Sequence, residues 1–374
     1  MINNDPKKIL LVQLFSNGDC LYATAVARQI KTNFPGSHLT WAIADFCQDI
    51  IDLNPYVDAK LIVTEVKKND VAAFRKLRKR FYKEKKQGKW DEVFITLNMD
   101  NNQALYDGTI RGMILRAYPF PITVPFQPVL VLSEEEKKRV ADFSSKHNLS
   151  RFKNIILWEY APQSGQSVLH FDFVMKLSQR ITKLTSTCIV LSSARSFQST
   201  ENIIDASSLT VRENAALTHY CNLLIGCSSG LTWISTSSAA RMLPMVQLLN
   251  PLTAFINAPS VDFKRYGSST EKLLEIITIE EERIYNCIKI ILQKSFPEAK
   301  SIYNEELPLQ FNTTRKVVYN MLCYLQFGAV AKHFSIITSV YGKHPLFFKK
   351  FAVAIVTFPF KLASNIIKKK IIRK

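Results

Sequence analysis

Asp19 is the residue near the start of the chain whose type and position suggest chemistry. It closes a turn of small and polar residues at 16–19, which follows an apolar run over 9–15 that predicts a buried strand. Apolar residues then recur at roughly helical spacing over 21–30. Ligands of a parallel α/β sheet bind outside the carboxyl ends of its strands, where this turn lies. Asp19 is therefore a candidate catalytic carboxylate, and the alternative is that it caps the helix.

Asn17 and Gly18 belong to the same turn, so we assign them to the same candidate site. Asp100 is assigned to that site as well, because its loop, 98–102, follows a predicted strand at 93–97. A plain turn is the alternative for Asp100.

Two loops in the second half of the chain could hold phosphate. The segment 226–232 joins a predicted strand to a helix with small and hydroxyl residues, and the segment 159–167 carries hydroxyls, amides and a glycine. Backbone N–H groups at such turns bind phosphate, and small residues let it approach. Each loop alone is also an ordinary strand-to-helix turn. The candidate phosphate-binding residues are Gln163, Ser164, Gly165, Ser228, Ser229, Gly230, Leu231 and Thr232.

Arg195 follows a predicted strand at 188–191 and could supply a cation to that phosphate site. An exposed surface arginine is the alternative. We expect no metal, because no suitable loop carries the Asp-x-Asp arrangement that would ligate one.

The pattern of strands and helices predicts two doubly wound α/β domains in tandem. The first half adds strands near 39–44 and 60–66, and four prolines within 119–128 mark a linking segment. The second half restarts the pattern, and we expect an amphipathic helix over 273–292 after its last strand. The predicted strands of the second half are 154–158, 188–191, 203–205, 222–226 and 244–249.

The net charge of +18 is concentrated in two segments. Residues 67–89 contain eleven basic and two acidic residues, and an amphipathic helix is predicted over 71–86. This helix presents either a solvated face or a patch for anionic phosphates or lipid head groups. Residues 307–374 contain twelve basic residues and no acidic residue. A basic nucleic-acid binder is a lesser possibility, since no recognised motif accompanies the charge.

Residues 315–374 predict a basic amphipathic tail that associates with a membrane. The apolar run 351–360 is too short to span a bilayer and contains Pro359, and lysines flank it on both sides. We therefore expect residues 343–374 to lie on an anionic membrane surface. The alternative is that the tail forms helices packed on the core.

The seven cysteines are odd in number and scattered, without a C-x-x-C pair. This usage favours reduced thiols in a cytoplasmic protein and argues against a zinc site. No secretory signal is expected at the N-terminus.

Several short motifs, in a specific order, resemble the glycosyltransferases of family 9, the heptosyltransferase-like enzymes. The resemblance runs from about residue 7 to residue 250. The matching motifs are Ser-Asn-Gly-Asp-Cys-Leu at 16–21, Ala-Thr-Ala at 23–25, Asn-Pro-Tyr-Val-Asp at 54–58, Leu-Ile-Gly at 224–226, Ser-Gly at 229–230, Ala-Ala at 239–240 and Pro244.

The resemblance implies a GT-B fold, in which two Rossmann-like domains face each other across a cleft. Residues 1–140 would form the acceptor-side domain and residues 150–310 the donor domain, which binds a nucleotide-diphosphate sugar. Asn17, Gly18 and Asp100 would then lie on the acceptor side, and the phosphate-binding loops with Arg195 on the donor side. It also implies metal-independent transfer with inversion at the anomeric centre, with Asp19 as general base and a lipopolysaccharide-type or other surface-glycan acceptor. Such an enzyme would be peripheral on the inner face of the cytoplasmic membrane.

The sequence departs from the family pattern at the donor site. Ser228 stands where the family has Asp, Trp233 where it commonly has His, and Gln166 or Ser167 where it has a phosphate-binding Lys or Arg. The donor sugar is therefore open, and a non-catalytic relative that binds a sugar nucleotide or glycan is the alternative function. Retention of Asp19 favours the enzyme.

Overall fold

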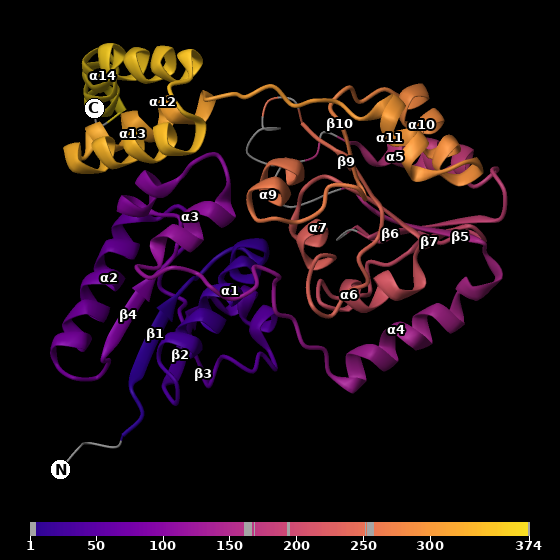
Figure 1. Ribbon diagram of the computed structural model, residues 1–374, viewed down its shortest axis with the longest axis horizontal. Helices are drawn as coiled ribbons and strands as arrows, with labels where there is room; N and C mark the ends of the chain where they lie inside the picture. The colour runs from indigo at the N-terminus through magenta and orange to yellow at the C-terminus, as the bar shows by residue number, and fades with distance from the viewer. Residues whose placement is uncertain are drawn as a thin grey trace.

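Two parallel β-sheets organise the protein (Figure 1). The computed structural model describes residues 5–160, 167, 169–192, 195–250, 252 and 258–372, the last nine of them by backbone alone. The first sheet has the order β3-β2-β1-β4, and the second has the order β10-β9-β8-β5-β6-β7. The strands of the first sheet are β1 (Lys8–Val12), β2 (His38–Ile43), β3 (Ala59–Ile62) and β4 (Glu92–Ile95). Those of the second are β5 (Asn154–Glu159), β6 (Thr187–Ser192), β7 (Ile203–Asp205), β8 (Leu223–Gly226), β9 (Met245–Leu248) and β10 (Leu273–Ile276).

Each sheet has a reversal point, where successive strands stop being added on one side of the first strand and continue on its other side. The reversal falls between β1 and β4 in the first sheet and between β5 and β8 in the second. Ligands of open α/β sheets bind at such points, outside the carboxyl ends of the strands. The predicted architecture of two Rossmann-like domains is confirmed.

Helices cover both sheets. The first domain contains α1 (Asn17–Asn33), η1 (Asp45–Ile51), α2 (Val71–Lys86), η2 (Asp100–Leu105) and α3 (Ile110–Ala117). The second contains α4 (Glu134–Lys146), η3 (Leu149–Arg151), α5 (Phe171–Ile181), α6 (Glu213–Leu217), η4 (Thr218–Tyr220), α7 (Gly230–Ile234), α9 (Pro259–Arg265), α10 (Glu281–Gln293) and α11 (Phe296–Tyr303). Helix α4 begins at a capping box, in which Ser133 and Glu136 each accept a hydrogen bond from the other's backbone N–H.

The predicted helix over 273–292 is wrong in its first part. Leu273–Ile276 forms β10, a fully buried edge strand parallel to β9, and the helix begins only at Glu281. A strand buried on both faces reads as a short continuous apolar run, and periodicity alone does not separate it from a buried helix.

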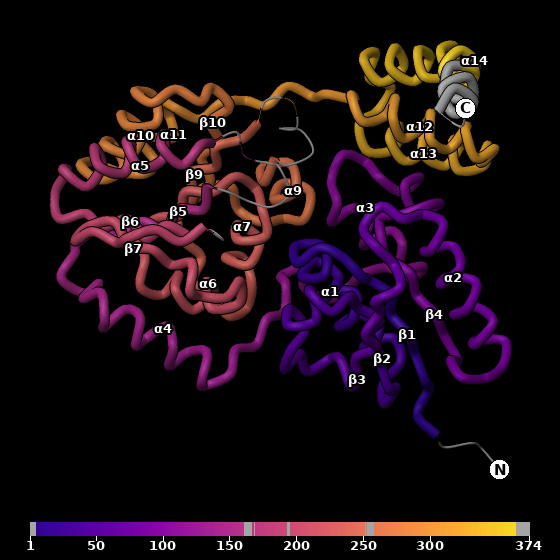
Figure 2. Tube along the Cα trace, turned by 180° about the vertical axis from the view of Figure 1, so that it is seen from behind, coloured from indigo at the N-terminus to yellow at the C-terminus, as the bar shows by residue number. Residues whose placement is uncertain are grey.

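The C-terminal segment forms three helices that pack on the first domain (Figures 1 and 2). They are α12 (Asn312–Cys323), α13 (Phe327–Tyr341) and α14 (Pro345–Ile372). Phe311 and Phe347 are buried together in an aromatic cluster, and the Tyr341 hydroxyl donates to the Asp107 carbonyl (2.7 Å). The segment is thus part of the folded body, which agrees with the alternative that the tail forms helices packed on the core. No helix among the described residues is long and apolar enough to cross a membrane.

Candidate active site

The turns that follow β1 and β8 touch each other across the two domains. A Cβ added to Gly18 would lie 3.8 Å from the Gly230 Cα, and one added to Gly230 would lie 4.0 Å from the Gly18 nitrogen. Both turns stand beside the reversal points of their sheets. The structure therefore brings the predicted acceptor-side and donor-side turns to one place.

Asp19 lies in the first turn of α1, beside this contact, and the residue as a whole is partly exposed. The N-cap of α1 is Ser16, and within the described part of the chain no hydrogen bond is recorded for the Asp19 carboxylate. Burial raises the pKa of Asp19 to about 7, while the charge of Lys68 lowers it. A carboxyl group with a pKa near neutrality is suited to accept a proton at physiological pH.

Lys68 is a neighbour of Asp19 that sequence reasoning did not identify. It lies in the loop between β3 and α2, and its charge acts on the Asp19 carboxylate. Because β3 and β1 are parallel members of one sheet, their following loops share an edge. The sequence could have pointed to Lys68 because its loop follows a predicted strand, as the turn that carries Asp19 does.

Glu159 is a second carboxylate that was not among the candidate residues. It ends β5, and its Oε2 accepts a hydrogen bond from the Ser229 hydroxyl. Burial raises the pKa of Glu159 to about 7, and the Ser229 hydrogen bond opposes that shift. A carboxylate at the carboxyl end of the strand next to the reversal point could have been flagged from the sequence.

Gln247 of strand β9 holds the loop that carries Ser228 through hydrogen bonds. The Ser228 N–H donates to Gln247 Oε1 (2.7 Å), and the Thr232 hydroxyl donates to the same oxygen (3.0 Å). A Cβ at Gly226 would lie 2.7 Å from the Thr232 hydroxyl oxygen, so this close approach requires glycine. The Ser228 hydroxyl is buried and has no hydrogen-bond partner among the described residues.

The side chains of Leu231 and Thr232 are buried, so only their backbone groups could meet a donor. Arg195 is exposed, with its guanidinium 4.0 Å from the centre of the Phe171 ring at the start of α5. Gln163, Ser164 and Gly165 lie outside the described residues.

Asp100 is engaged elsewhere, which corrects its assignment to the acceptor side. Its carboxylate is buried and pairs with Arg75 (2.6 Å) and Arg78 (2.7 Å) of α2. Gln326, in the turn between α12 and α13, also donates to it (3.1 Å). Burial alone would raise the pKa of Asp100, but the Arg75 hydrogen bond and the Arg78 charge bring it below its usual value. Asp100 therefore joins α2 to the C-terminal helices.

Replacing Asp100 by asparagine is expected to lower the free energy of unfolding by about 2 kcal/mol at pH 7, because hydrogen bonds to a charged group are lost. A lowered pKa means that this stabilisation is present at neutral pH and disappears as the pH falls below about 4. The difference between the two proteins in urea unfolding should therefore shrink at acid pH, and an equal difference at both pH values would contradict the assignment.

Asn17 is the acceptor-side residue that borders a cavity. This cavity, of about 610 Å³, lies between η1 and the segments that begin α4 and α6. The Asn17 side-chain oxygen is buried and has no hydrogen-bond partner within the described residues. Phe46, Leu53 and Val211 expose apolar surface at the rim. The cavity thus has apolar side chains at its rim and is bordered by a residue directly next to the Gly18 contact.

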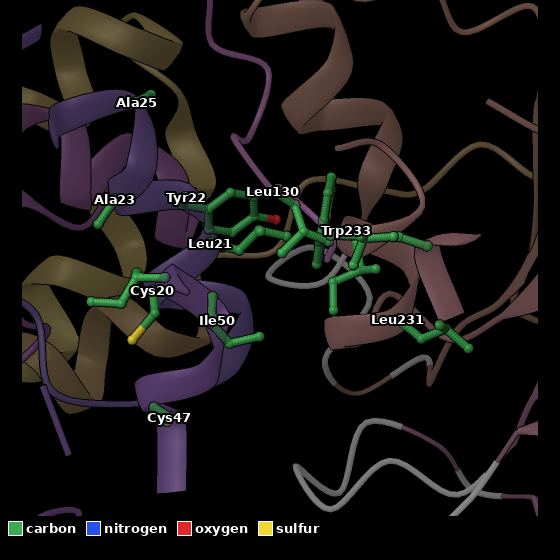
Figure 3. Close-up of a cluster of buried hydrophobic side chains, with 14 of the residues drawn as sticks. Cys20, Leu21, Tyr22, Ala23, Ala25, Cys47, Ile50, Leu130, Leu231 and Trp233 are labelled. Carbon is green, nitrogen blue, oxygen red and sulfur yellow. The ribbon is translucent and has the colours of Figure 1, made fainter. Parts of the chain in front are cut away.

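Arg111 of α3 joins the two domains behind the turns. It pairs with Asp262 of α9 (3.2 Å), and both side chains are almost completely buried. Its guanidinium lies 4.6 Å from the centre of the Tyr22 ring and 5.3 Å from that of Trp233. Figure 3 shows Tyr22 of α1 and Trp233 of α7 directed toward each other from the two domains, with ring centres 5.1 Å apart. Trp233 therefore packs between the domains.

Comparisons with known proteins place this architecture among the GT-B glycosyltransferases. No model of a protein family matches the chain, and no curated protein sequence is similar to it. Among solved structures, a family 9 glycosyltransferase from Veillonella parvula is similar over 78% of this chain and 98% of its own, with a TM-score of 0.54 and 17% identity. The E. coli ADP-heptose LPS heptosyltransferase II is similar over 77% and 99%, with a TM-score of 0.50 and 16% identity. The chain therefore has the fold of these enzymes.

Proposed function

We propose that the protein is an inverting glycosyltransferase that moves a sugar from a nucleotide-diphosphate sugar to a glycan acceptor, with Asp19 as general base. The observation that carries this proposal is the position of Asp19. The residue is partly exposed, its carboxyl group has a pKa of about 7, and it follows Gly18, which meets the turn after β8 beside the reversal points of the two sheets.

The reaction is a single displacement. An acceptor hydroxyl oxygen forms a bond to the anomeric carbon while the bond from that carbon to the diphosphate oxygen breaks. The hydroxyl proton passes to Asp19, and the bonding electron pair leaves with the nucleoside diphosphate. Asp19 serves this step because a base with a pKa near the working pH is largely ionised and still holds the transferred proton.

Glu159 is proposed to take the place of the carboxylate that the 226–230 turn lacks. Ser228 occupies the position of the family's Asp, and the neighbouring Ser229 binds Glu159. Among the described residues, the hydrogen bond recorded for this carboxylate engages Oε2 alone, so Oε1 can accept a bond from a donor hydroxyl. The carboxylate is thus supplied from β5 instead of the turn.

The proposed acceptor is lipid-linked, of the lipopolysaccharide type or a related surface glycan. We propose that the enzyme works in the cytoplasm as a peripheral protein on the inner face of the cytoplasmic membrane, held there by residues 343–374. The basic and apolar composition of that segment supports this location.

The rate of transfer should depend on pH through Asp19. Only the ionised carboxylate accepts a proton, so kcat is expected to rise as the pH increases through about 7 and to level off above it. The measurement is the initial rate with saturating substrates from about pH 5 to about pH 9, a range that brackets this titration. A flat profile across that range would contradict the assignment of Asp19.

Replacing Glu159 by glutamine should weaken donor binding more than it slows transfer. Loss of a hydrogen bond to a charged group corresponds to an increase of about 10- to 100-fold in the donor Kd. Calorimetric titration with the nucleotide sugar measures this, and Glu271→Gln, an exposed carboxylate of the same domain, is the matched control. An unchanged donor Kd in Glu159→Gln would remove Glu159 from the donor site.

A thermal-shift screen against nucleotide sugars tests the proposed function. A true donor present at 100 times its Kd stabilises the folded state by about 2.7 kcal/mol, so one sugar nucleotide should raise the melting temperature clearly above the others. A non-catalytic relative is the second candidate, favoured by Ser228 and by the packing of Trp233 between the domains. It would show the shift without release of nucleoside diphosphate.

A further inference from the structure

The positive charge of the chain is confined to two segments that lie far apart in the sequence. Residues 67–89 carry eleven basic and two acidic residues, a net charge of +9, and residues 307–374 carry +12. The total is +18, so the rest of the chain has a net charge of −3. The charge therefore marks particular places on the protein, where a negatively charged partner would bind.

The structure brings these two segments together. Arg75 and Arg78 of α2 pair with Asp100, and Gln326 donates to the same carboxylate. The Arg75 guanidinium also lies 4.4 Å from the centre of the Tyr324 ring. Figures 1 and 2 show α2 and α12–α14 stacked along one side of the first domain, away from the second. One surface therefore carries both basic segments.

Helix α2 contributes a row of lysines to this surface. Its buried residues Phe74, Leu77 and Phe81 pack on the first sheet, so the opposite side faces solvent. The exposed row follows helical spacing, and no ion pair is recorded for its members in the part of the chain that the structure describes. These residues are Lys76, Lys79, Lys83 and Lys86.

The turn between α12 and α13 contributes exposed apolar side chains. Leu325 is 72% exposed and Phe327 is 64% exposed. Leu325 also has a φ of +55°, in the left-handed region that is costly for a residue with a Cβ. Burial of the Leu325 side chain does not offset this backbone strain, because the side chain lies in water. The strain therefore indicates a role in binding.

Helix α14 contributes an apolar outward face. Phe347 and Ala354 are buried, whereas Ile355, Val356 and Phe360 are exposed, Val356 by 67% and Phe360 by 76%. Exposed apolar residues on a helix whose other side is already packed have no intramolecular reason to be apolar.

Contacts with α12 place this part of α14 beside the turn. The ring centres of Phe358 and Tyr319 lie 6.2 Å apart, and Lys361 Nζ lies 5.3 Å from the centre of the Tyr319 ring. Tyr319 stands in the last part of α12, which ends at Cys323, directly before the 324–327 turn. The apolar residues of α14 and those of the turn thus stand on neighbouring elements.

We propose that the α2 lysine row, the 324–327 turn and the outward face of α14 form one surface that docks on an anionic lipid bilayer. The proposal rests on the membrane location proposed above and extends it from the tail to the first domain. Lysines next to an anionic bilayer gain electrostatic attraction, and the apolar side chains between them enter the interface. A nucleic acid would satisfy the lysines but leave Leu325, Phe327 and Phe360 in water.

This surface fixes how the protein stands on the membrane. The first domain, which carries Asp19, lies against the bilayer, and the second domain projects away from it (Figure 1). An acceptor held by a lipid would then reach the first domain directly, while a nucleotide sugar would enter the second domain from the aqueous side.

Flotation with lipid vesicles tests the contribution of α2. The variant replaces Lys76, Lys79, Lys83 and Lys86 by glutamine in the full chain, and the vesicles are an equimolar mixture of phosphatidylglycerol and phosphatidylcholine. Each lysine near an anionic surface contributes a factor of about five in binding, so the partition coefficient should fall by at least about 100-fold. The matched control neutralises four exposed lysines of the second domain and should change binding by less than about threefold. These are Lys138, Lys146, Lys183 and Lys272.

Equal losses in the two variants, or full binding by the α2 variant, would overturn the proposal. So would binding to duplex DNA or RNA that exceeds binding to the vesicles. Because the assay contains no sugar nucleotide, its result is independent of whether the protein transfers sugar.

Fluorescence tests whether the turn enters the bilayer. Leu325→Trp places an indole at the turn, where the natural tryptophans, Trp41, Trp90, Trp158 and Trp233, are all buried. Brominated lipids should quench the new fluorophore and shift its emission to the blue when vesicles are added. The control is Phe46→Trp, an exposed aromatic at the rim of the cavity, which should show neither change. The same response from both tryptophans, or from neither, would refute insertion of the turn.

Discussion

Replacing Asp19 by asparagine is expected to lower kcat by about 10²- to 10⁴-fold, the range that a positioned general base contributes. Asparagine keeps the size of the side chain and cannot accept the proton. The donor is bound by the second domain in our account, so the donor Kd should change by less than about twofold, well under the cost of one hydrogen bond. Initial rates and calorimetric titration with the nucleotide sugar measure the two quantities.

Two further variants separate the role of Asp19 as a base from a structural one. Asp142→Asn alters an exposed carboxylate on α4 and should leave kcat unchanged. Asp19→Glu keeps a carboxylate on a longer side chain and should retain more activity than the asparagine variant. If Asp19→Asn lost donor affinity and thermal stability together with activity, a structural role would explain the result better.

Replacing Arg111 by alanine should have the largest effect on stability, about 3–5 kcal/mol. The change leaves Asp262 buried without its partner and removes the cation from between Tyr22 and Trp233. Urea unfolding at pH 7 measures the loss. Lys137→Ala, which breaks an exposed ion pair with Glu134, should cost less than about 1 kcal/mol.

The pH dependence of the Arg111→Ala variant follows from Asp262. Burial raises the pKa of Asp262 to about 6, and the Arg111 charge opposes that shift, so removing the arginine raises the pKa further. A raised pKa means that the folded state holds the proton more tightly and gains stability as the pH falls. The loss should therefore be smaller at about pH 5 than at about pH 8.

A double variant separates the buried charge from simple loss of packing. Arg111→Met combined with Asp262→Leu should recover most of the stability, since apolar residues of similar volume replace a buried pair at little cost. A double variant as unstable as Arg111→Ala would mean that the charge pair is not the cause.

Local patterns were sufficient to predict the fold because its signals are local. The apolar run before Asp19 became β1, and the small residues at 226–230 became the turn between β8 and α7. Two such strand–turn–helix units, repeated in tandem, specify two parallel sheets. The prediction for 273–276 was wrong because four buried residues in a row fit a strand or a helix equally well.

Contacts between distant residues were not visible in the sequence. The pairing of Arg111 with Asp262 joins residues about 150 positions apart, and Asp100 meets Gln326 across more than 200. Asp100 followed a strand just as Asp19 did, so position alone could not separate them. What separates them is the arginines of α2, which pair directly with Asp100, whereas the charge of Lys68 acts on Asp19 with no ion pair recorded among the described residues.

The most direct test of the central claim is the release of nucleoside diphosphate from the nucleotide sugar that the thermal-shift screen selects. The reaction is followed with and without a lipid-linked glycan acceptor, for the natural protein and for Asp19→Asn. We expect acceptor-dependent release by the natural protein and almost none by the variant, with donor binding intact in both. Equal release by the two proteins, or binding of the sugar nucleotide with no release by either, would contradict it.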